Sequence, residues 1–475
     1  MIQAVDFSPL GEDVVRQLPY SSKDLSLYQR LIQYFAAVSA AQGEYLDIIN
    51  FHRDVYPTVV PLSECETLFR PEHGYASPDG SPEVGLLIRA YEKMRAECFA
   101  RESSVHIKME FERLGAGLGS GTTGVMNCLL PAIRDVSTRS APCIALSVPL
   151  YSVYDGIARE HGLRPVYLQT RRDMDFLPTA EDVNHILRQR PVALVLTFPG
   201  NPAQTTYSPS RIDELTKIVR MCRDAQTYLI ADNIYQDTLW SEHAINPEIL
   251  ALAETDRFLV KVSGLSKDRP GCSGWRIGHW IGDATLQERY FYYASIQYNT
   301  PNSASRCVLA LDLLLRMARL RGGGIDGADL DLIGDDVAGW NRRVDRKRLF
   351  TRLTQSDLAT RWLARLDHVE LRQRKALDLV TRMARGTDVF SDVVNGHIGN
   401  VLLVRVSPAF FDGTDHEFFI RLMNTARIGV LPANAFGFAV TPGEAWFRIT
   451  TIHDQPHRVA EQLDRVARAI RTGLA

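Results

Sequence analysis

A lysine inside a loop of small residues is the part of this sequence that most directly suggests chemistry. Lys267 follows the apolar run Phe258–Val262, with Ser263 and Ser266 before it and Arg276 after it. A loop rich in glycine and serine lets a ligand approach the backbone closely, and arginine with serine suits a phosphate. A lysine beside a phosphate site can hold pyridoxal phosphate as an imine. Most single lysines are solvated surface charges, so the rest of the chain must decide.

A second candidate phosphate site is the glycine-rich segment Gly115–Gly124, which we interpret as a turn that opens a helix over Val125–Ile133. Backbone amides at a helix start, with the hydroxyls of Thr122 and Thr123, form a cradle for a phosphate. A dinucleotide fingerprint would need a glycine at Ser120, and a nucleoside-triphosphate loop would need a lysine after the last glycine. The segment therefore favours a single phosphate monoester.

Three polar residues and two tyrosines complete the candidate chemistry. Asp232 ends an apolar strand, where a buried carboxylate needs a partner such as a protonated pyridine nitrogen, although a helix-capping role is equally consistent. Tyr235 follows three residues later, Asn201 is consistent with a turn residue, and Tyr151 with a core residue. Arg448 stands in an apolar strand, where its guanidinium suits bidentate recognition of a substrate carboxylate.

The elements that must position these residues alternate along the middle of the chain. Six short runs have strand character, namely 142–148, 166–168, 192–198, 228–231, 258–262 and 277–281, and amphipathic segments separate them. This alternation predicts an α/β domain with a mostly parallel sheet and helices on both faces. Because such sheets bind ligands beyond the carboxyl ends of their strands, we expect the candidate residues to share one pocket.

Domain organisation follows from the length of 475 residues and from shifts in composition. We expect an N-terminal arm and helix over residues 1–70, a large α/β domain over 71–315, a helical linker or insertion over 316–385, and a small α+β domain over 386–475. The charged stretch within 321–370 is interpreted as a solvated helix face. Strand-like 401–406 and 446–450 belong to the small domain.

Composition excludes several classes of protein. Hydrophobic content of 45%, charged content of 23% and a net charge of −2 describe an ordinary globular chain with no basic nucleic-acid surface. Seven scattered cysteines show no metal-like pairing and indicate free thiols in a reducing cytosol. Neither a signal peptide nor a membrane-spanning run is predicted. We therefore expect a cytoplasmic protein without a metal site, a nucleic-acid partner or a membrane.

Taken in order, these residues resemble the fold-type I pyridoxal-phosphate enzymes of the aspartate aminotransferase superfamily, over roughly Tyr75 to Arg448. The sequence around the candidate active-site residues is similar to that of 1-aminocyclopropane-1-carboxylate synthases and related class I and II aminotransferases. The resemblance implies pyridoxal 5'-phosphate as cofactor and a homodimer with shared active sites.

The resemblance also implies a role for each matching residue. Lys267 resembles the Schiff-base lysine, Asp232 the partner of the pyridine nitrogen, and Tyr151 the ring that stacks on the cofactor. Asn201 and Tyr235 resemble the pair bonded to the cofactor's ring hydroxyl, and Arg448 the arginine for the substrate carboxylate. The remaining cofactor-binding candidates surround the phosphate and are Tyr75 from the partner subunit, Gly121, Thr122, Thr123, Ser263, Ser266 and Arg276.

The chain departs from the family pattern in several places. The family's serine three residues before the lysine is Gly264 here, and Arg276 follows Lys267 by nine residues instead of eight. The departure leaves open which serine would bind the phosphate. His52 and Arg53 replace small residues expected near the substrate, and are consistent either with recognition of an unusual substrate or with surface positions. The small domain offers residues 395–399 where the family usually has proline and small residues.

Three functions are compatible with these residues. The first is an aminotransferase in which Lys267 moves the α-proton. The second is another pyridoxal-phosphate reaction, such as γ-elimination, replacement or cyclisation on S-adenosylmethionine, or an oxidation or decarboxylation of an amino acid. The third is a regulator that only binds the cofactor. Because one fold supports many reactions, the sequence names neither the substrate nor the reaction, although aminotransfer is the first choice.

Overall fold

The computed structural model describes residues 5–20, 25–41, 46–47, 84–237, 247–269, 272–298, 303–329, 357–394, 399–451 and 456–473. Tyr75, His52, Arg53, most of 395–399 and most of the 321–370 segment lie outside the described residues, so the predictions made for them remain predictions. Among the described helices, none combines the length and the apolar character needed to cross a bilayer.

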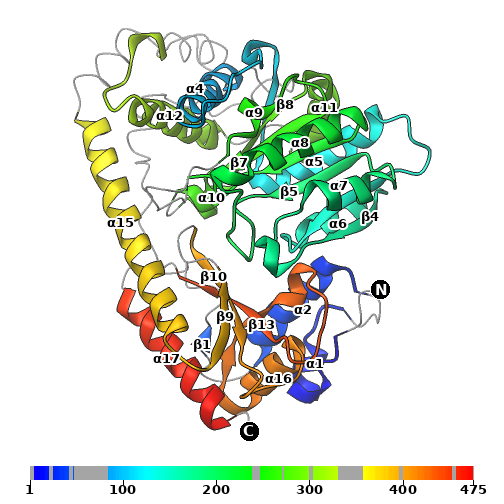
Figure 1. The fold of residues 1–475 in the computed structure, drawn as a ribbon, viewed down its shortest axis with the longest axis vertical. Coiled ribbons are helices and arrows are strands. Elements are labelled where there is room, and N and C mark those ends of the chain that lie inside the picture. The colour runs from blue at the N-terminus through cyan, green and yellow to red at the C-terminus, as the bar shows by residue number, and fades with distance from the viewer. Residues whose placement is uncertain are drawn as a thin grey trace.

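A seven-stranded sheet forms the larger of two bodies (Figure 1). Only β8 runs antiparallel to its neighbours β2 and β7, while the pairs from β7 to β4 are parallel. The predicted mostly parallel sheet is therefore confirmed, and each of the six predicted strands is present with ends shifted by at most two residues. In spatial order the strands are β2 (Gly115–Ser120), β8 (Ile277–Gly282), β7 (Leu259–Gly264), β6 (Tyr228–Asp232), β5 (Ala193–Thr197), β3 (Cys143–Val148) and β4 (Arg164–Gln169).

Helices cover both faces of this sheet because both faces are apolar. In β6, Tyr228 and Ile230 belong to one core, while Leu229 and Ala231 belong to a second core on the opposite face. The first core is completed by α5 (Gly121–Val136), α6 (Val153–Glu160) and α11 (Gln287–Tyr298). The second core is completed by α4 (Gly85–Ser103), α7 (Ala180–Leu187), α8 (Ile212–Asp224), α9 (Ile249–Leu252) and α12 (Ser303–Leu320).

The smaller body contains a four-stranded antiparallel sheet, in the order β12 (Leu431–Pro432), β13 (Trp446–Thr450), β10 (Val401–Val406) and β9 (Phe390–Val394). The long helix α15 runs along one side of the molecule between the two bodies and packs against the C-terminal helix (Figure 1). The N-terminal segment joins this body, because β1 (Leu46–Asp47) pairs with β11 (Ile428–Gly429). Its helices are α1 (Glu12–Arg16), α2 (Leu27–Ala40), α15 (Leu358–Arg385), α16 (Asp415–Ala426) and α17 (Pro456–Gly473).

Short helical turns connect these elements. The loop that carries Lys267 begins with the four-residue helix α10 (Leu265–Asp268). The 3₁₀ turns are η1 (Ser8–Leu10), η3 (Phe111–Arg113), η4 (Arg172–Met174), η5 (Pro209–Arg211), η6 (Ser273–Trp275), η7 (Ala284–Leu286) and η8 (Ala433–Phe436).

The glycine-rich segment differs from its predicted form. Its first half is strand β2 and not a turn, and α5 begins at Gly121, four residues before the predicted start. The glycines serve close packing, because a Cβ on Gly117 would lie 2.5 Å from the indole nitrogen of Trp280. Within this segment, only Gly121 has a positive φ, of +69°, a backbone conformation that favours glycine; it lies at the junction between strand and helix.

Candidate active site

The strands β5, β6 and β7 end at one edge of the large sheet, where the residues that follow them line a cavity of about 490 Å³. The small body contributes the opposite wall through Leu431, Phe436 and Arg448. The expectation that the candidate residues share one pocket is therefore met for most of them. The candidates that line the cavity are Thr122, Thr123, Tyr151, Asn201, Asp232, Tyr235, Ser266, Lys267, Arg276 and Arg448.

Lys267 lies in α10, so its amine reaches the cavity directly after strand β7 ends. Burial lowers the pKa of Lys267 to about 8, and the positive charges of Arg448 and Arg276 act in the same direction. No described acidic residue forms an ion pair with this amine. A lysine with such a pKa is a stronger candidate for a nucleophile or a base near neutral pH than an ordinary lysine.

Asp232 is the last residue of β6 and is 1% exposed. The hydroxyl of Tyr154 donates to its Oδ2 at 2.7 Å, and the backbone amide of Ile234 donates to its Oδ1 at 3.2 Å. Burial raises the pKa of Asp232 to about 6, although the hydrogen bond from Tyr154 opposes this. Since no described cation pairs with it, Asp232 is a carboxylate prepared for a positively charged partner.

An anion cradle lies where α5 begins. The amide of Gly121 donates to the carbonyl oxygen of Arg276 at 2.8 Å, and Arg276 has a positive φ of 53°. A Cβ on Gly121 would lie 2.7 Å from a guanidinium nitrogen of Arg276, so the arginine closely approaches the start of the helix. Thr122 and Thr123 occupy the first turn of α5, and the free amides of that turn favour an anion.

The two candidate serines beside Lys267 differ in position. Ser266 lines the cavity, and its buried hydroxyl has no hydrogen-bond partner among the described residues. Ser263 is buried within strand β7 and is not among the residues that line the cavity. Gly264 has no room for a side chain, because a Cβ there would lie 2.7 Å from the carbonyl oxygen of Ile277. This contact gives a steric reason for the absence of a serine at position 264.

Arg448 enters the cavity from strand β13 of the small body. One guanidinium nitrogen donates to Oδ1 of Asn201 at 3.2 Å, and the group lies over the ring of Phe436, with 5.3 Å to its centroid. Its buried Nε has no hydrogen-bond partner among the described residues, and burial lowers the pKa of Arg448. No described carboxylate pairs with Arg448, so the guanidinium is available to bind an anionic ligand.

Sequence reasoning missed part of the cavity wall. Tyr154 was not singled out, although it follows Tyr151 by three residues and its ring lies edge-on to that of Tyr151, with 5.6 Å between the centroids. Helix α2 was not singled out, although its Ser26–Gln29 capping box marks a helix start. Thr197, opposite Asp232 in the parallel ladder, and Ser273 in η6 were also missed. The additional lining residues include Tyr28, Leu31, Ile32, Phe35, Val153, Tyr154, Thr197, Ile234, Ser273, Leu431 and Phe436.

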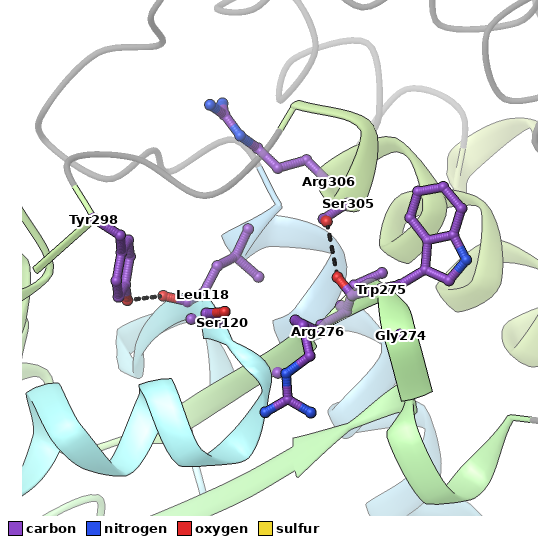
Figure 2. Close-up of a pocket in the computed structure, with 11 residues that line it drawn as sticks. Leu118, Ser120, Gly274, Trp275, Arg276, Tyr298, Ser305 and Arg306 are labelled. Carbon is purple, nitrogen blue, oxygen red and sulfur yellow. Dashed lines mark hydrogen bonds between the residues drawn. The ribbon is translucent and has the colours of Figure 1, made fainter. Parts of the chain in front are cut away.

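A second cavity of about 320 Å³ shares Arg276 with the first (Figure 2). In this view the guanidinium groups of Arg276 and Arg306 point away from each other. The hydroxyl of Ser305 donates a hydrogen bond to the carbonyl oxygen of Trp275 at 3.3 Å, so its proton is already used within the protein. Neither Lys267 nor Asp232 lines this space, so the first cavity is the candidate active site.

Comparison with known proteins agrees with this arrangement. The family model described as aminotransferase class I and II matches residues 63–470. The aspartate/prephenate aminotransferase of Thermus thermophilus is 29% identical over 232 residues, which cover 49% of this chain and 54% of the relative. The aspartate aminotransferase of Rhizobium meliloti is 23% identical over 415 residues, covering 87% of this chain and 85% of the relative.

The match thus spans about half the length of several curated relatives and most of another. Among solved structures, an aspartate aminotransferase from Rhizobium meliloti superposes with a TM-score of 0.66 at 19% identity, covering 96% of this chain and all of the other. At this sequence identity the structural similarity shows only a shared fold, and that fold agrees with the predicted α/β architecture.

Proposed function

The chain belongs to the family of class I and II aminotransferases, and from this premise we propose that it is a pyridoxal-phosphate-dependent aminotransferase acting on an α-amino acid. The observation that supports this most is the meeting, in one cavity, of a lysine with a lowered pKa and of a buried carboxylate and an arginine that form no ion pair with any described residue. An enclosed site with groups of this kind is typical of cofactor and amino-acid binding.

The residues present fit pyridoxal phosphate. Asp232 is buried without a cationic partner, which suits a protonated ring nitrogen. The buried hydroxyl of Ser266, which has no partner in the part of the chain that the structure describes, and the guanidinium of Arg276 beside Gly121 suit a phosphate. Lys267 has an amine for the aldehyde carbon. This set of side chains matches neither the ligands of a metal ion nor the fingerprint of a dinucleotide site.

We assign roles on this basis. Lys267 would hold the cofactor covalently, and Asp232 would bind its ring nitrogen. Tyr151 would cover the ring, while Asn201 and Tyr235 would approach its hydroxyl side. The phosphate would bind to Gly121, Thr122, Thr123, Ser266 and Arg276, and Tyr75 of a second subunit is carried over from the family resemblance. Ser263 is left out of this set because it does not line the cavity.

When bound, pyridoxal phosphate supplies a ring that accepts the electron pair left at the substrate α-carbon. The chain does the rest. Arg448 would orient the substrate carboxylate through its paired N–H groups, and thereby the α-proton. Lys267 Nζ, once free of the cofactor, would take the α-proton, which its pKa of about 8 permits near neutral pH. The ionised form of Asp232 would keep a proton on the ring nitrogen.

We further propose that the functional unit is a homodimer. Tyr292 and Ile296 on α11 are 51% and 64% exposed, which is unusual for large apolar residues on one helix. A second copy of the chain would cover them, and Ile296→Asp would weaken that contact. Sedimentation velocity tests this proposal, and a fully active monomer at assay concentration would contradict it.

The experiment that tests the function is a half-reaction without acceptor. The purified protein with pyridoxal phosphate should convert to the pyridoxamine form when an amino acid is added, and a 2-oxo acid should restore the original spectrum. Borohydride reduction and peptide mapping should find the cofactor on Lys267, and Lys267→Ala should lose both results. The exposed Lys93→Ala is the matched control. Turnover without any oxo-acid acceptor would reject aminotransfer in favour of elimination or oxidation.

The alternative reaction on S-adenosylmethionine gains no separate support. The described groups that line the cavity include three cations and one carboxylate, and that carboxylate is assigned to the cofactor. A sulfonium substrate would therefore meet no free opposite charge there.

A further inference from the structure

The cavity has two chemically different walls. One wall carries the groups assigned above to the cofactor and to the substrate carboxylate. The other wall is apolar and is formed largely by α2, whose residues Tyr28, Leu31, Ile32 and Phe35 all line the cavity. These positions are spaced by three, one and three residues, so they form one face of a helix. Leu431, the cross-strand partner of Arg448, adds an apolar group beside that arginine.

Helix α2 is anchored to both bodies by hydrogen bonds and close packing. The amide of Leu27 donates to the buried carboxylate of Asp155 in α6 at 3.1 Å. On the side of the small body, the hydroxyl of Tyr34 lies 2.8 Å from Nδ1 of His416. A Cβ on Gly156 would lie 2.9 Å from the ring of Tyr28, which shows how closely α6 approaches α2. A preformed apolar wall selects ligands by their side chain.

The charges around the cavity limit the substrate further. Among the described residues that line it, the cations are Lys267, Arg276 and Arg448, and the acidic residue is Asp232. Under the proposed function each of the four has a partner in the cofactor or in the substrate α-carboxylate. A second carboxylate on the substrate would therefore be buried against Ile32 and Phe35 without a described counter-charge. Burial of an unpaired charge is strongly unfavourable.

From this arrangement we propose that the substrates are L-amino acids with bulky apolar side chains, aromatic ones foremost, and that the α2 face Tyr28–Leu31–Ile32–Phe35 determines this specificity. The proposal rests on the proposed function. The four residues of the α2 face carry no cation for the second carboxylate of a dicarboxylic amino acid, whereas they would bury an apolar side chain.

Binding of carboxylates that lack an amino group tests the inference independently of turnover. With pyridoxal phosphate present, isothermal titration calorimetry would compare 3-phenylpropanoate with butanedioate. We expect 3-phenylpropanoate to bind between about tenfold and a hundredfold more tightly, which is the range for burial of one phenyl side chain. The same order should appear in kcat/KM for L-phenylalanine against L-aspartate.

Two variants on α2 assign the preference to this face. Ile32→Arg should weaken 3-phenylpropanoate at least about tenfold and strengthen butanedioate, because it supplies the missing cation. Ser39→Arg, an exposed position on the same helix, is the matched control and should change neither. If Ile32→Arg does not fold, Phe35→Ala adds no charge and should still weaken 3-phenylpropanoate about tenfold while butanedioate is unchanged.

The outcomes separate the two proposals. Equal or tighter binding of butanedioate by the unmodified protein would overturn the inference, and so would equal responses of Ile32→Arg and Ser39→Arg. Amino transfer that prefers L-aspartate would keep the proposed function and reject the substrate class. Preference for 3-phenylpropanoate without any amino transfer would reject the proposed reaction and retain the apolar ligand class of the cavity.

Discussion

Two regions of this protein bury charges on either side of the Lys267 loop, and they do so in opposite ways. In the first region, between α4, α12 and β7, buried cations have acidic partners. Lys261 Nζ lies 2.6 Å from a carboxylate oxygen of Glu248, Arg95 lies 2.6 Å from Asp237, and Arg269 lies 2.8 Å from Asp312. Arg316 joins the network by binding Asp237 and Asp312. In the second region, the candidate active site, Lys267, Asp232 and Arg448 have no described ion pair.

The pKa shifts follow this difference. Burial alone would raise the pKa of Glu92, but Lys261 and neighbouring donors lower it to about 2, and burial of Lys261 is outweighed by Glu248 and Glu92, which raise its pKa. In the cavity, burial is not opposed by a counter-charge, so the pKa of Asp232 rises and that of Lys267 falls. The paired charges of Glu92 and Lys261 therefore stay ionised, while Asp232 and Lys267, without a described counter-charge, have pKa values shifted towards the neutral form.

The largest expected effect comes from making the same substitution in both regions. Lys261→Met should destabilise the cofactor-free chain by about 3–5 kcal/mol, because it leaves Glu92 and Glu248 buried without their cation. Lys267→Met, six positions away, should leave the free energy of unfolding equal or increase it, because it removes an unpaired buried charge. Urea unfolding at pH 7 measures both. A similar loss for the two variants would contradict the distinction between the regions.

The pH dependence of the unfolding free energy gives a second test of Lys267→Met. The folded-state pKa of Lys267 is about 8, below its ordinary value of 10.5, so the unfolded chain binds more protons between these two values. The unfolding free energy of the unmodified protein therefore gains from this residue as pH rises through that window. The advantage of Lys267→Met should be largest below pH 8 and disappear towards pH 10.5.

A smaller effect is expected at Arg448. Arg448→Lys keeps the positive charge but loses the paired N–H groups, which should weaken 3-phenylpropanoate by about ten- to a hundredfold, or about 1.5–3 kcal/mol. Because Arg448 has no described ion pair, unfolding should change little. Arg405→Lys, in the neighbouring strand β10 and near Glu444, is the control. Lost stability with unchanged ligand affinity would make Arg448 a structural residue.

The smallest effect is expected from Tyr154→Phe, which removes the hydrogen bond to Asp232. Because this bond stabilises the carboxylate, its loss should move the pKa of Asp232 further above about 6. The variant should lose about 1 kcal/mol of stability at pH 8 and less at pH 4.5, where Asp232 is protonated in both proteins. Unfolding curves at the two pH values measure this loss. In the background of Asp232→Asn, which has no titrating carboxylate at this position, Tyr154→Phe should cost the same stability at both pH values.

Local patterns were sufficient for much of this molecule. Apolar runs predicted six of the seven strands of the large sheet, since a strand buried on both faces must be apolar along its length. The strand-end positions of Asp232 and Lys267 then predicted a shared pocket, because parallel strands end at one edge. The glycine-rich segment was predicted less well, because its first half is a strand and not a turn. Its glycines permit close contacts that the local sequence does not reveal: Gly117 packs against Trp280 of another strand, and Gly119 against Val125 of the following helix.

The sequence by itself determined the fold class and the residue types of the site, because hydrophobic periodicity and strand-end chemistry are local properties of the chain. Only the tertiary structure decided that Ser266 and not Ser263 faces the cavity, that Tyr154 donates to Asp232, and that α2 forms the apolar wall. These facts depend on which distant segments meet. Helix α2 lies more than two hundred residues before Lys267, and no local pattern encodes the packing that brings them to one cavity.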